Sequence, residues 1–353
     1  MCIRDRRDAV ATRAYGGSEV PDVTYGARTL FRRLGERLST VIAVLLGLAA
    51  LVVFTAFRWK LLLQGVGIKL AFLRVARLSF IGGFFNLAVP GSTGGDFVKA
   101  WYAQKEARAR YEGEKGIGTK AVLSVFVDRF VGLFGLVVFA AGVLLLTARG
   151  EAYDMPRLVV LSVLAVGIVG GVIVVSRRVR RALGLSWLVK KLPLQHILEE
   201  LQAAARLYRS HGGTLLAALG ISLFNHAANA TACYFLARAL GIEGVTLWAA
   251  LALVPLANLL SAIPLLPGGW GVGELAFAYF FGLVGVPATE AVGLSVVFRL
   301  AVLGVNLPGG LLWIFWRGHP STETITAEVE AATAPVRDAE SEAASSNAPE
   351  ETP

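Results

Sequence analysis

Twice in this chain, a glycine-rich and uncharged turn leads directly into a carboxylate. The two segments are Pro90-Gly91-Ser92-Thr93-Gly94-Gly95-Asp96 and Pro267-Gly268-Gly269-Trp270-Gly271-Val272-Gly273-Glu274. Thr93 and Asp96 have the spacing of a helix capping box, and Gly271 with Glu274 repeats that spacing. A helix that begins at such a turn has approachable N–H groups at its positive end, which suits a phosphate or carboxylate ligand.

Charged residues inside apolar segments form a second group of candidates. Asp128 and Arg129 lie within one apolar run, and Arg299 lies within another. A charge at membrane depth is costly unless it is paired or solvated. We expect Asp96 or Asp128 to neutralise Arg129 and, by the same logic, Glu274 to pair with Arg299. The alternatives are long side chains that reach the membrane surface, or ion pairs that join helices without a ligand.

The turns and these charges together predict one ligand site for an anionic group. Its predicted residues are Asn86, Pro90, Gly91, Ser92, Thr93, Gly94, Gly95, Asp96, Lys99, Asp128, Arg129, Pro267, Gly268, Gly269, Gly271, Gly273, Glu274 and Arg299. The sequence offers no nucleophile–base set and no metal-binding acid cluster, and Cys2 and Cys233 indicate neither a disulfide framework nor a thiolate metal site. We therefore expect no metal, no cofactor and no catalytic residue.

Polar residues elsewhere favour structural roles. Asn225, His226 and Asn229 make a polar stripe about one helical turn long in an apolar run, and such side chains often join membrane helices. Asn86 and Asn258 precede the two turns, where an amide side chain can cap backbone groups that a broken helix leaves free.

Composition sets the class of protein. Hydrophobic residues make up 55% of the 353 residues and charged residues only 17%, which is far more apolar surface than one soluble core needs. The chain is therefore an integral membrane protein. Uncharged apolar runs occur at 41–57, 78–95, 130–148, 158–176, 212–237, 244–273, 275–289 and 300–316.

These runs predict an all-α, polytopic membrane protein with about eight membrane segments, because a spanning helix needs about 20 mostly apolar residues. Each half contains a helix that glycine and proline break or turn back. Backbone of this kind is tolerated at membrane depth only where it is buried in protein or lines a cavity. Whether the segments near 90 and 270 span or re-enter, and whether the halves are parallel or inverted repeats, stays open.

Lysine and arginine predict the topology. They collect in the first 39 residues, after the first turn and between 177 and 211, which places these regions and both termini on the cytoplasmic side of the cell membrane. Basic residues from Arg58 to Arg77 contradict this orientation, and we attribute them to long side chains that snorkel. Trp59 is expected to be an interfacial anchor. The net charge of +9 is assigned to topology and contact with anionic lipid, not to nucleic acid.

The chain divides into three parts: a basic cytoplasmic segment at 1–38, a transmembrane domain at 39–317 and an acidic tail at 318–353 that is too polar to fold. The first residues, Met1-Cys2-Ile3-Arg4-Asp5-Arg6, resemble translated adapter sequence and are given no functional role.

The motifs carry a family resemblance. They are Arg58-Trp59, Asn86 with Pro90-Gly91-x-x-Gly94-Gly95-Asp96 and Lys99, Asp128-Arg129, Pro267-Gly268-Gly269-x-Gly271-x-Gly273-Glu274, and Arg299. Together, over roughly residues 35–317, they resemble the lysylphosphatidylglycerol synthase transmembrane region, a flippase-like family. The resemblance implies a polytopic inner-membrane domain that moves a lipid across the bilayer. Because no aminoacyl-transferase domain follows Arg317, synthesis of the lysyl lipid is not expected.

Three functions remain open from the sequence. The first is a non-enzymatic translocator of an anionic or lipid-linked substrate, and we expect the chain not to be an enzyme. The second is a scaffold for a lipid-modifying enzyme, which would then be a protein partner. The third is a component of lipid-dependent glycosyl or aminoacyl transfer. Substrate, direction, energy source and oligomeric state are not readable from the sequence.

Overall fold

The computed structural model describes residues 11–15, 18–22, 27–88, 94–114, 116–146, 150–176, 203–261 and 270–315. Several predicted features lie outside these residues: most of the first turn, part of the second turn and the acidic tail. They are Pro90, Gly91, Ser92, Thr93, Pro267, Gly268, Gly269 and 318–353.

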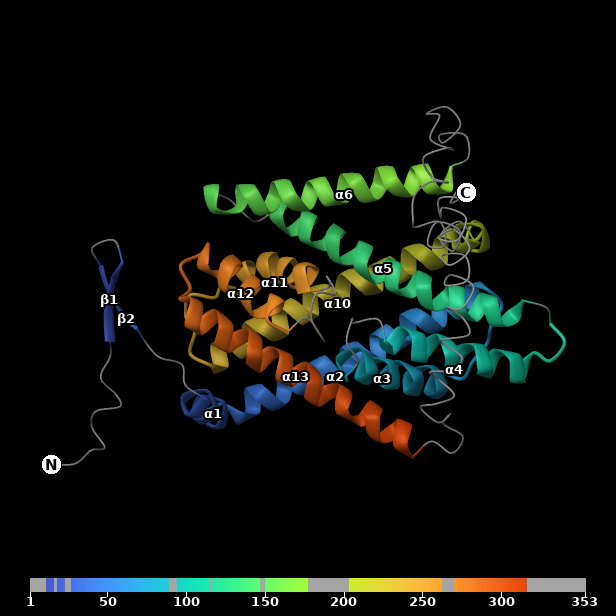
Figure 1. The fold of residues 1–353 in the computed structure, drawn as a ribbon, viewed down its shortest axis with the longest axis horizontal. Coiled ribbons are helices and arrows are strands. Elements are labelled where there is room, and N and C mark those ends of the chain that lie inside the picture. Colours follow the sequence, from blue (N-terminus) through green and yellow to red (C-terminus); the bar gives the residue numbers. More distant parts are fainter. Residues whose placement is uncertain are drawn as a thin grey trace, which may run out of the picture. The chain divides into compact units, whose positions relative to one another are not determined.

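Helices make up almost all of the described structure, as predicted (Figure 1). The first helices are α1 (Ala27–Glu36), α2 (Leu38–Gly65), α3 (Phe72–Ala88), α4 (Gly94–Arg110), α5 (Ile117–Leu146) and α6 (Asp154–Val175), with a short 3₁₀ turn, η2 (Glu151–Tyr153). After residue 203 come α10 (Gly212–Ala239), α11 (Leu247–Ser261), α12 (Val272–Gly282) and α13 (Ala288–Ile314). A short antiparallel hairpin of β1 (Ala11–Tyr15) and β2 (Ser18–Asp22) precedes them.

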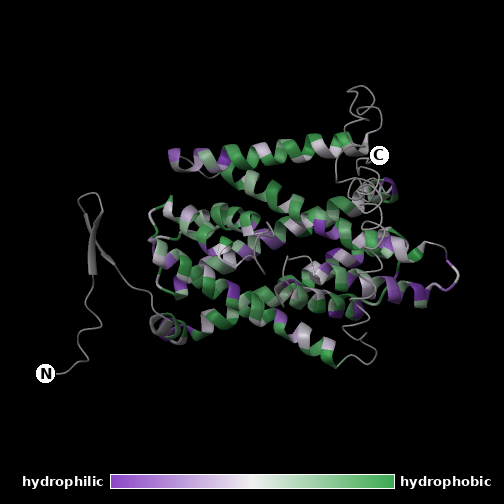
Figure 2. Cartoon of the chain, viewed as in Figure 1, coloured by the Kyte–Doolittle hydropathy of each residue, from purple (hydrophilic) through white to green (hydrophobic). Residues whose placement is uncertain are grey.

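Each of the eight apolar runs contributes to at least one helix, which confirms a polytopic helical membrane protein. Among the described helices, α2, α5, α6 and α13 are long and apolar enough to cross a membrane, and α11 and α12 are shorter apolar helices. Figure 2 shows hydrophobic residues over most of α6, whereas α4 is largely polar. Large apolar side chains such as Leu46, Val166 and Leu275 are exposed on the outside, as expected of surfaces that face lipid.

The helices on either side of the two glycine-rich segments are separate elements. Helix α3 ends at Ala88 and α4 begins at Gly94, and α11 ends at Ser261 while α12 begins at Val272. Helix α10 lies along α2 and α5, and α11 packs on α5 and α12. Helix α3 packs on α2 and α4, and α4 packs on α5, so the helices that flank the first turn belong to one bundle with α2, α5 and α10.

Candidate functional site

A polar cavity of about 480 Å³ lies among the apolar helices. Helices α2, α3, α4, α5, α10, α11 and α13 all contribute to its wall. Its polar lining consists of Thr55, Arg58, Ser79, Asn86, Asp96, Lys99, Asp128, Arg129, Asn225, His226, Asn229, Asn258 and Asn306. Polar side chains inside a membrane bundle commonly mark a substrate or ion pathway.

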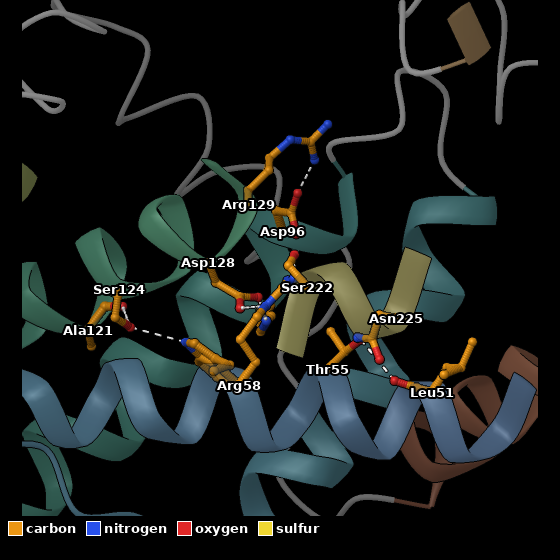
Figure 3. Close-up of polar contacts among 12 residues, drawn as sticks. Leu51, Thr55, Arg58, Asp96, Ala121, Ser124, Asp128, Arg129, Ser222 and Asn225 are labelled. Carbon is orange, nitrogen blue, oxygen red and sulfur yellow. Dashed lines mark hydrogen bonds and ion pairs between the residues drawn. The ribbon is translucent and has the colours of Figure 1, made fainter. Parts of the chain in front are cut away.

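The deepest charges of the cavity form a triad around Asp128. One carboxylate oxygen, Oδ1, accepts from Arg58 Nε at 2.8 Å (Figure 3). The other, Oδ2, accepts from Lys99 Nζ at 2.9 Å. All three side chains are less than 10% exposed. Two cations share one anion here, so the triad carries a net positive charge in a place where charge is expensive.

Neighbouring residues fix the two cations of the triad. Arg58 Nη1 donates to Ser222 Oγ at 2.7 Å, which ties α2 to α10. Lys99 Nζ lies 4.1 Å from the centre of the Trp59 ring, close enough for a cation–π contact. Gly135 leaves room for this arrangement, because a Cβ atom at that position would lie 2.7 Å from Ser222 Cβ.

Two expectations about the end of α2 are wrong. Arg58 does not snorkel but is buried and bound to Asp128, because a carboxylate from α5 is available inside the bundle. Trp59 is not an interfacial anchor: it is fully buried, and its indole N–H donates to Ser124 Oγ at 3.1 Å.

A second ion pair, Asp96 with Arg129, also lines the cavity (Figure 3). Its side chains come from α4 and α5 and are 26% and 38% exposed, so they are more accessible than the triad. The structure confirms the prediction that a carboxylate of the first half neutralises Arg129. Asp96 has this role, whereas Asp128 neutralises the cations that the sequence analysis left unpaired.

The start of α4 positions Asp96 through a close approach of α3. Gly95 donates its backbone N–H to Asn86 Oδ1 at 3.0 Å, which confirms the predicted capping by Asn86. A Cβ atom on Gly95 would lie 1.8 Å from the backbone oxygen of Gly82, so only glycine fits at this crossing.

The second motif builds a similar start for α12. Gly271 is the N-cap residue with φ of +81°, and its backbone N–H donates to Glu274 Oε2 at 2.5 Å, as the predicted spacing requires. Glu274 also forms the predicted ion pair with Arg299, at 3.2 Å between Oε1 and Nε. The guanidinium of Arg299 lies 4.9 Å from the centre of the Trp270 ring.

Residues of the first motif line the cavity, whereas the described residues of the second motif do not. Of the predicted residues within the described ranges, Asn86, Asp96, Lys99, Asp128 and Arg129 line it. Gly271, Gly273, Glu274 and Arg299 form the second ion-pair cluster and are not part of that lining, and Gly94 and Gly95 are not part of it either.

The second half still contributes to the cavity wall. Arg299, Val302 and Asn306 follow the three-and-four spacing of one helix face on α13, and the last two line the cavity. Asn258 on α11 also lines it. Arg299 is therefore only about 5 Å along the helix axis from the wall of the cavity.

Several site residues were missed or interpreted only as packing residues. Asn225 donates to Thr55 Oγ1 at 3.0 Å, the His226 ring lies 3.0 Å from the backbone oxygen of Gly132, and Asn258 donates to Asn229 Oδ1 at 3.2 Å. These contacts join helices as predicted, and the same residues line the cavity. The turn that Asn258 was predicted to cap lies largely outside the described residues, so this capping stays a prediction. The sequence did contain a sign of the role of Arg58, because this charged residue lies between two apolar stretches.

Two buried polar atoms of the wall have no hydrogen-bond partner among the described residues. They are Ser79 Oγ on α3 and Asn225 Oδ1 on α10, both in residues that are more than nine-tenths buried. A buried polar atom without a hydrogen-bond partner is costly, so each of these atoms marks a place where a ligand or a water molecule supplies the missing hydrogen bond. In the described part of the chain, no three His, Cys, Asp or Glu side chains are grouped so as to hold a metal ion.

Comparisons with known proteins place the chain among membrane proteins. Residues 24–310 match the family described as the lysylphosphatidylglycerol synthase TM region. The chain is also similar to UPF0104 membrane protein PH1989 of Pyrococcus horikoshii, with 26% identity over 292 residues, which covers 74% of this chain and 82% of the relative. The matched residues include α2 to α13 up to Gly310, and therefore the whole polar cavity.

Proposed function

Because this chain belongs to the lysylphosphatidylglycerol synthase TM region family, we propose that it is a non-enzymatic translocator that moves a lipid or lipid-linked substrate across the cytoplasmic membrane. Its substrate carries an anionic head group, which enters the polar cavity while the hydrocarbon chains stay in lipid. Both termini are on the cytoplasmic side, and the physiological partners are membrane lipids.

The charge of the cavity is the observation that carries this proposal. Three cations, Arg58, Lys99 and Arg129, face two carboxylates, Asp96 and Asp128, which leaves one net positive charge. Because apolar helices surround the cavity, an uncompensated charge inside it attracts a counter-ion more strongly than it would in water. A phosphodiester head group supplies the missing negative charge.

Size and hydrogen bonding support the same ligand class. A volume of about 480 Å³ falls within the range of about 300–1,000 Å³ that is usual for small-molecule sites. The five asparagines of the wall, with Ser79, offer donors and acceptors to a polar head group. Asn225 Oδ1 in particular is an acceptor for a hydroxyl or amino group on the substrate.

The chemistry of the wall favours transport over catalysis. Among its described residues, His226 is the only imidazole, and its Nε2 is 3.0 Å from the backbone oxygen of Gly132. An enzyme that forms a covalent intermediate needs a nucleophile with an adjacent base, and Ser79 Oγ has no hydrogen-bond partner among the described residues. The carboxylates are occupied by cations.

Reconstitution into vesicles tests the proposal. Purified protein is expected to move labelled phosphatidylglycerol or a polyprenyl-phosphate lipid between leaflets, and Lys99→Gln and Asp96→Asn are expected to slow this at least tenfold. The matched control is Glu106→Gln, which changes an acid on the same helix that pairs with the exposed Arg74. Equal activity in all four proteins would remove the site, and no lipid movement by the wild type would reject the translocator. Product formation from a donor substrate would favour an enzyme.

A further inference from the structure

A second cavity, of about 740 Å³, forms a groove between α2 and α10. Its wall is mostly apolar and built largely from small side chains. The residues are Ser39, Thr40, Ala43, Val44, Gly47, Leu51, Phe224, Ala227, Ala228, Thr231, Ala232 and Phe235. The groove is open to the outside of the bundle, since Phe224 and Phe235 in its wall are 51% and 47% exposed, so a molecule from the surrounding lipid can enter it.

Helices α2 and α10 are antiparallel and are hydrogen-bonded to each other at one end of the groove. Arg58 donates to Ser222, and Asn225 donates to Thr55, so residue numbers rise along α2 as they fall along α10. Phe54 and Phe224 pack with their ring centres 5.1 Å apart beside these contacts. Toward the start of α2, the facing residues are alanine, glycine and threonine, which leaves the groove open.

The groove lies next to the polar cavity, and Leu51 lines both spaces. On α2, Val44, Leu51, Thr55 and Arg58 lie on one helix face, so a single face changes from apolar at its start to polar and charged at its end. An elongated molecule that follows this face would place an apolar part against Val44 and a polar part against Arg58.

We infer that the groove holds one hydrocarbon chain of the lipid whose head group occupies the polar cavity, an inference that rests on the proposed function. The polar and apolar spaces lie next to each other at Leu51, in the order that an amphiphile requires.

The shape and lining of the groove suit a hydrocarbon chain. Its wall is mostly apolar and follows residues 39–51, about 18 Å along α2, so a chain of methylene groups that lies along it makes apolar contacts over its length.

Filling the groove tests the inference. A Cβ atom on Gly47 would meet no heavy atom within 4 Å, so Gly47→Leu places a side chain in the groove without a backbone clash. We expect this variant to move labelled phosphatidylglycerol at least tenfold more slowly and to retain less lipid through purification, as measured by mass spectrometry. The matched control is Gly142→Leu on α5, which also has open space around it and lines neither the cavity nor the groove.

The outcomes separate this inference from the proposed function. If Gly47→Leu matches the wild type while Lys99→Gln is inactive, the cavity acts in transport and the groove does not hold the chain. Equal losses in Gly47→Leu and Gly142→Leu would also overturn the inference, as would a change of oligomeric state in Gly47→Leu alone, which would indicate a helix on the groove. If the wild type moves no lipid, the proposed function itself fails.

Discussion

The segment from α3 to α5 and the segment from α11 to α13 use the same local design. In each, a helix begins after a glycine-rich turn with glycine as its second residue, Gly95 or Gly273, and an acid as its third. In each, the acid pairs with an arginine near the twelfth or thirteenth residue of the following long helix. The two ion pairs therefore have matching places in the two halves.

The surroundings of the two pairs differ. Asp96 and Arg129 are partly exposed and lie in a cavity with the Asp128 triad beside them, whereas Glu274 and Arg299 are 14% and 13% exposed and are covered by Trp270. The motif thus determines a broken helix and an ion pair, and the packed neighbours determine whether that pair faces a cavity. The first half is the better candidate for contact with a substrate.

The largest effect is expected at Asp128. Asp128→Asn leaves Arg58 and Lys99 buried without their anion, and breaking a buried pair in this way costs about 3–5 kcal/mol. Thermal unfolding in detergent should show a much lower midpoint. The double variant Asp128→Asn/Lys99→Met should recover part of the loss because it removes one uncompensated cation. If the double variant is no more stable than Asp128→Asn, uncompensated buried charge is not the cause of the loss.

Glycine-to-alanine changes should affect the first half more than the second. The new Cβ of Gly95→Ala meets the backbone oxygen of Gly82 at 1.8 Å, whereas that of Gly273→Ala meets the flexible side chain of Arg299 at 2.0 Å. Overpacking typically costs about 1–3 kcal/mol, and we expect Gly95→Ala to be at or above that range and Gly273→Ala within it. Unfolding midpoints compare them directly, and the reverse order would contradict the close packing of α3 on α4.

A double-mutant cycle measures the coupling energy between Glu274 and Arg299. Glu274→Gln and Arg299→Gln should each destabilise the protein, and the double variant should lose little more, with a coupling energy of about 1–2 kcal/mol. Strictly additive losses would show that the two side chains do not depend on each other. If the second half is structural, variants that remain folded should still transport lipid.

The same cycle at Asp96 and Arg129 should give the smallest effect on stability. The pair is partly solvated, so its coupling is expected to be at most about 1 kcal/mol. Transport, in contrast, should fall more in Asp96→Asn than in Glu274→Gln. Equal losses of transport at the two acids would remove the distinction between the halves.

Much of this arrangement was predictable from the sequence. The apolar runs and the turns predicted the helices and their interruptions, because both depend on local composition. The pair Glu274–Arg299, and the choice of Asp96 or Asp128 as the partner of Arg129, followed from the cost of an unpaired charge in a membrane.

The remaining site residues depend on contacts between distant segments. Arg58 and Asp128 are 70 positions apart, and nothing in the local sequence relates them. Asn225 and Asn258 also have the same appearance in the sequence whether they only join helices or line a cavity as well. Sequence reasoning therefore identified Asn86 and the charged residues of the first motif, but not Ser79 on α3 or the α2 and α10 side of the cavity.

Chemical labelling inside the cavity tests the central claim most directly. Ser79→Cys places a thiol in the wall at little change in size, in a background with Cys2→Ser, and the native Cys233 is fully buried. A small charged thiol reagent should modify this cysteine in detergent, and phosphatidylglycerol should slow the reaction at least fivefold while phosphatidylcholine does not. Labelling at the same rate with either lipid, or without lipid, would contradict an anionic head group in the cavity.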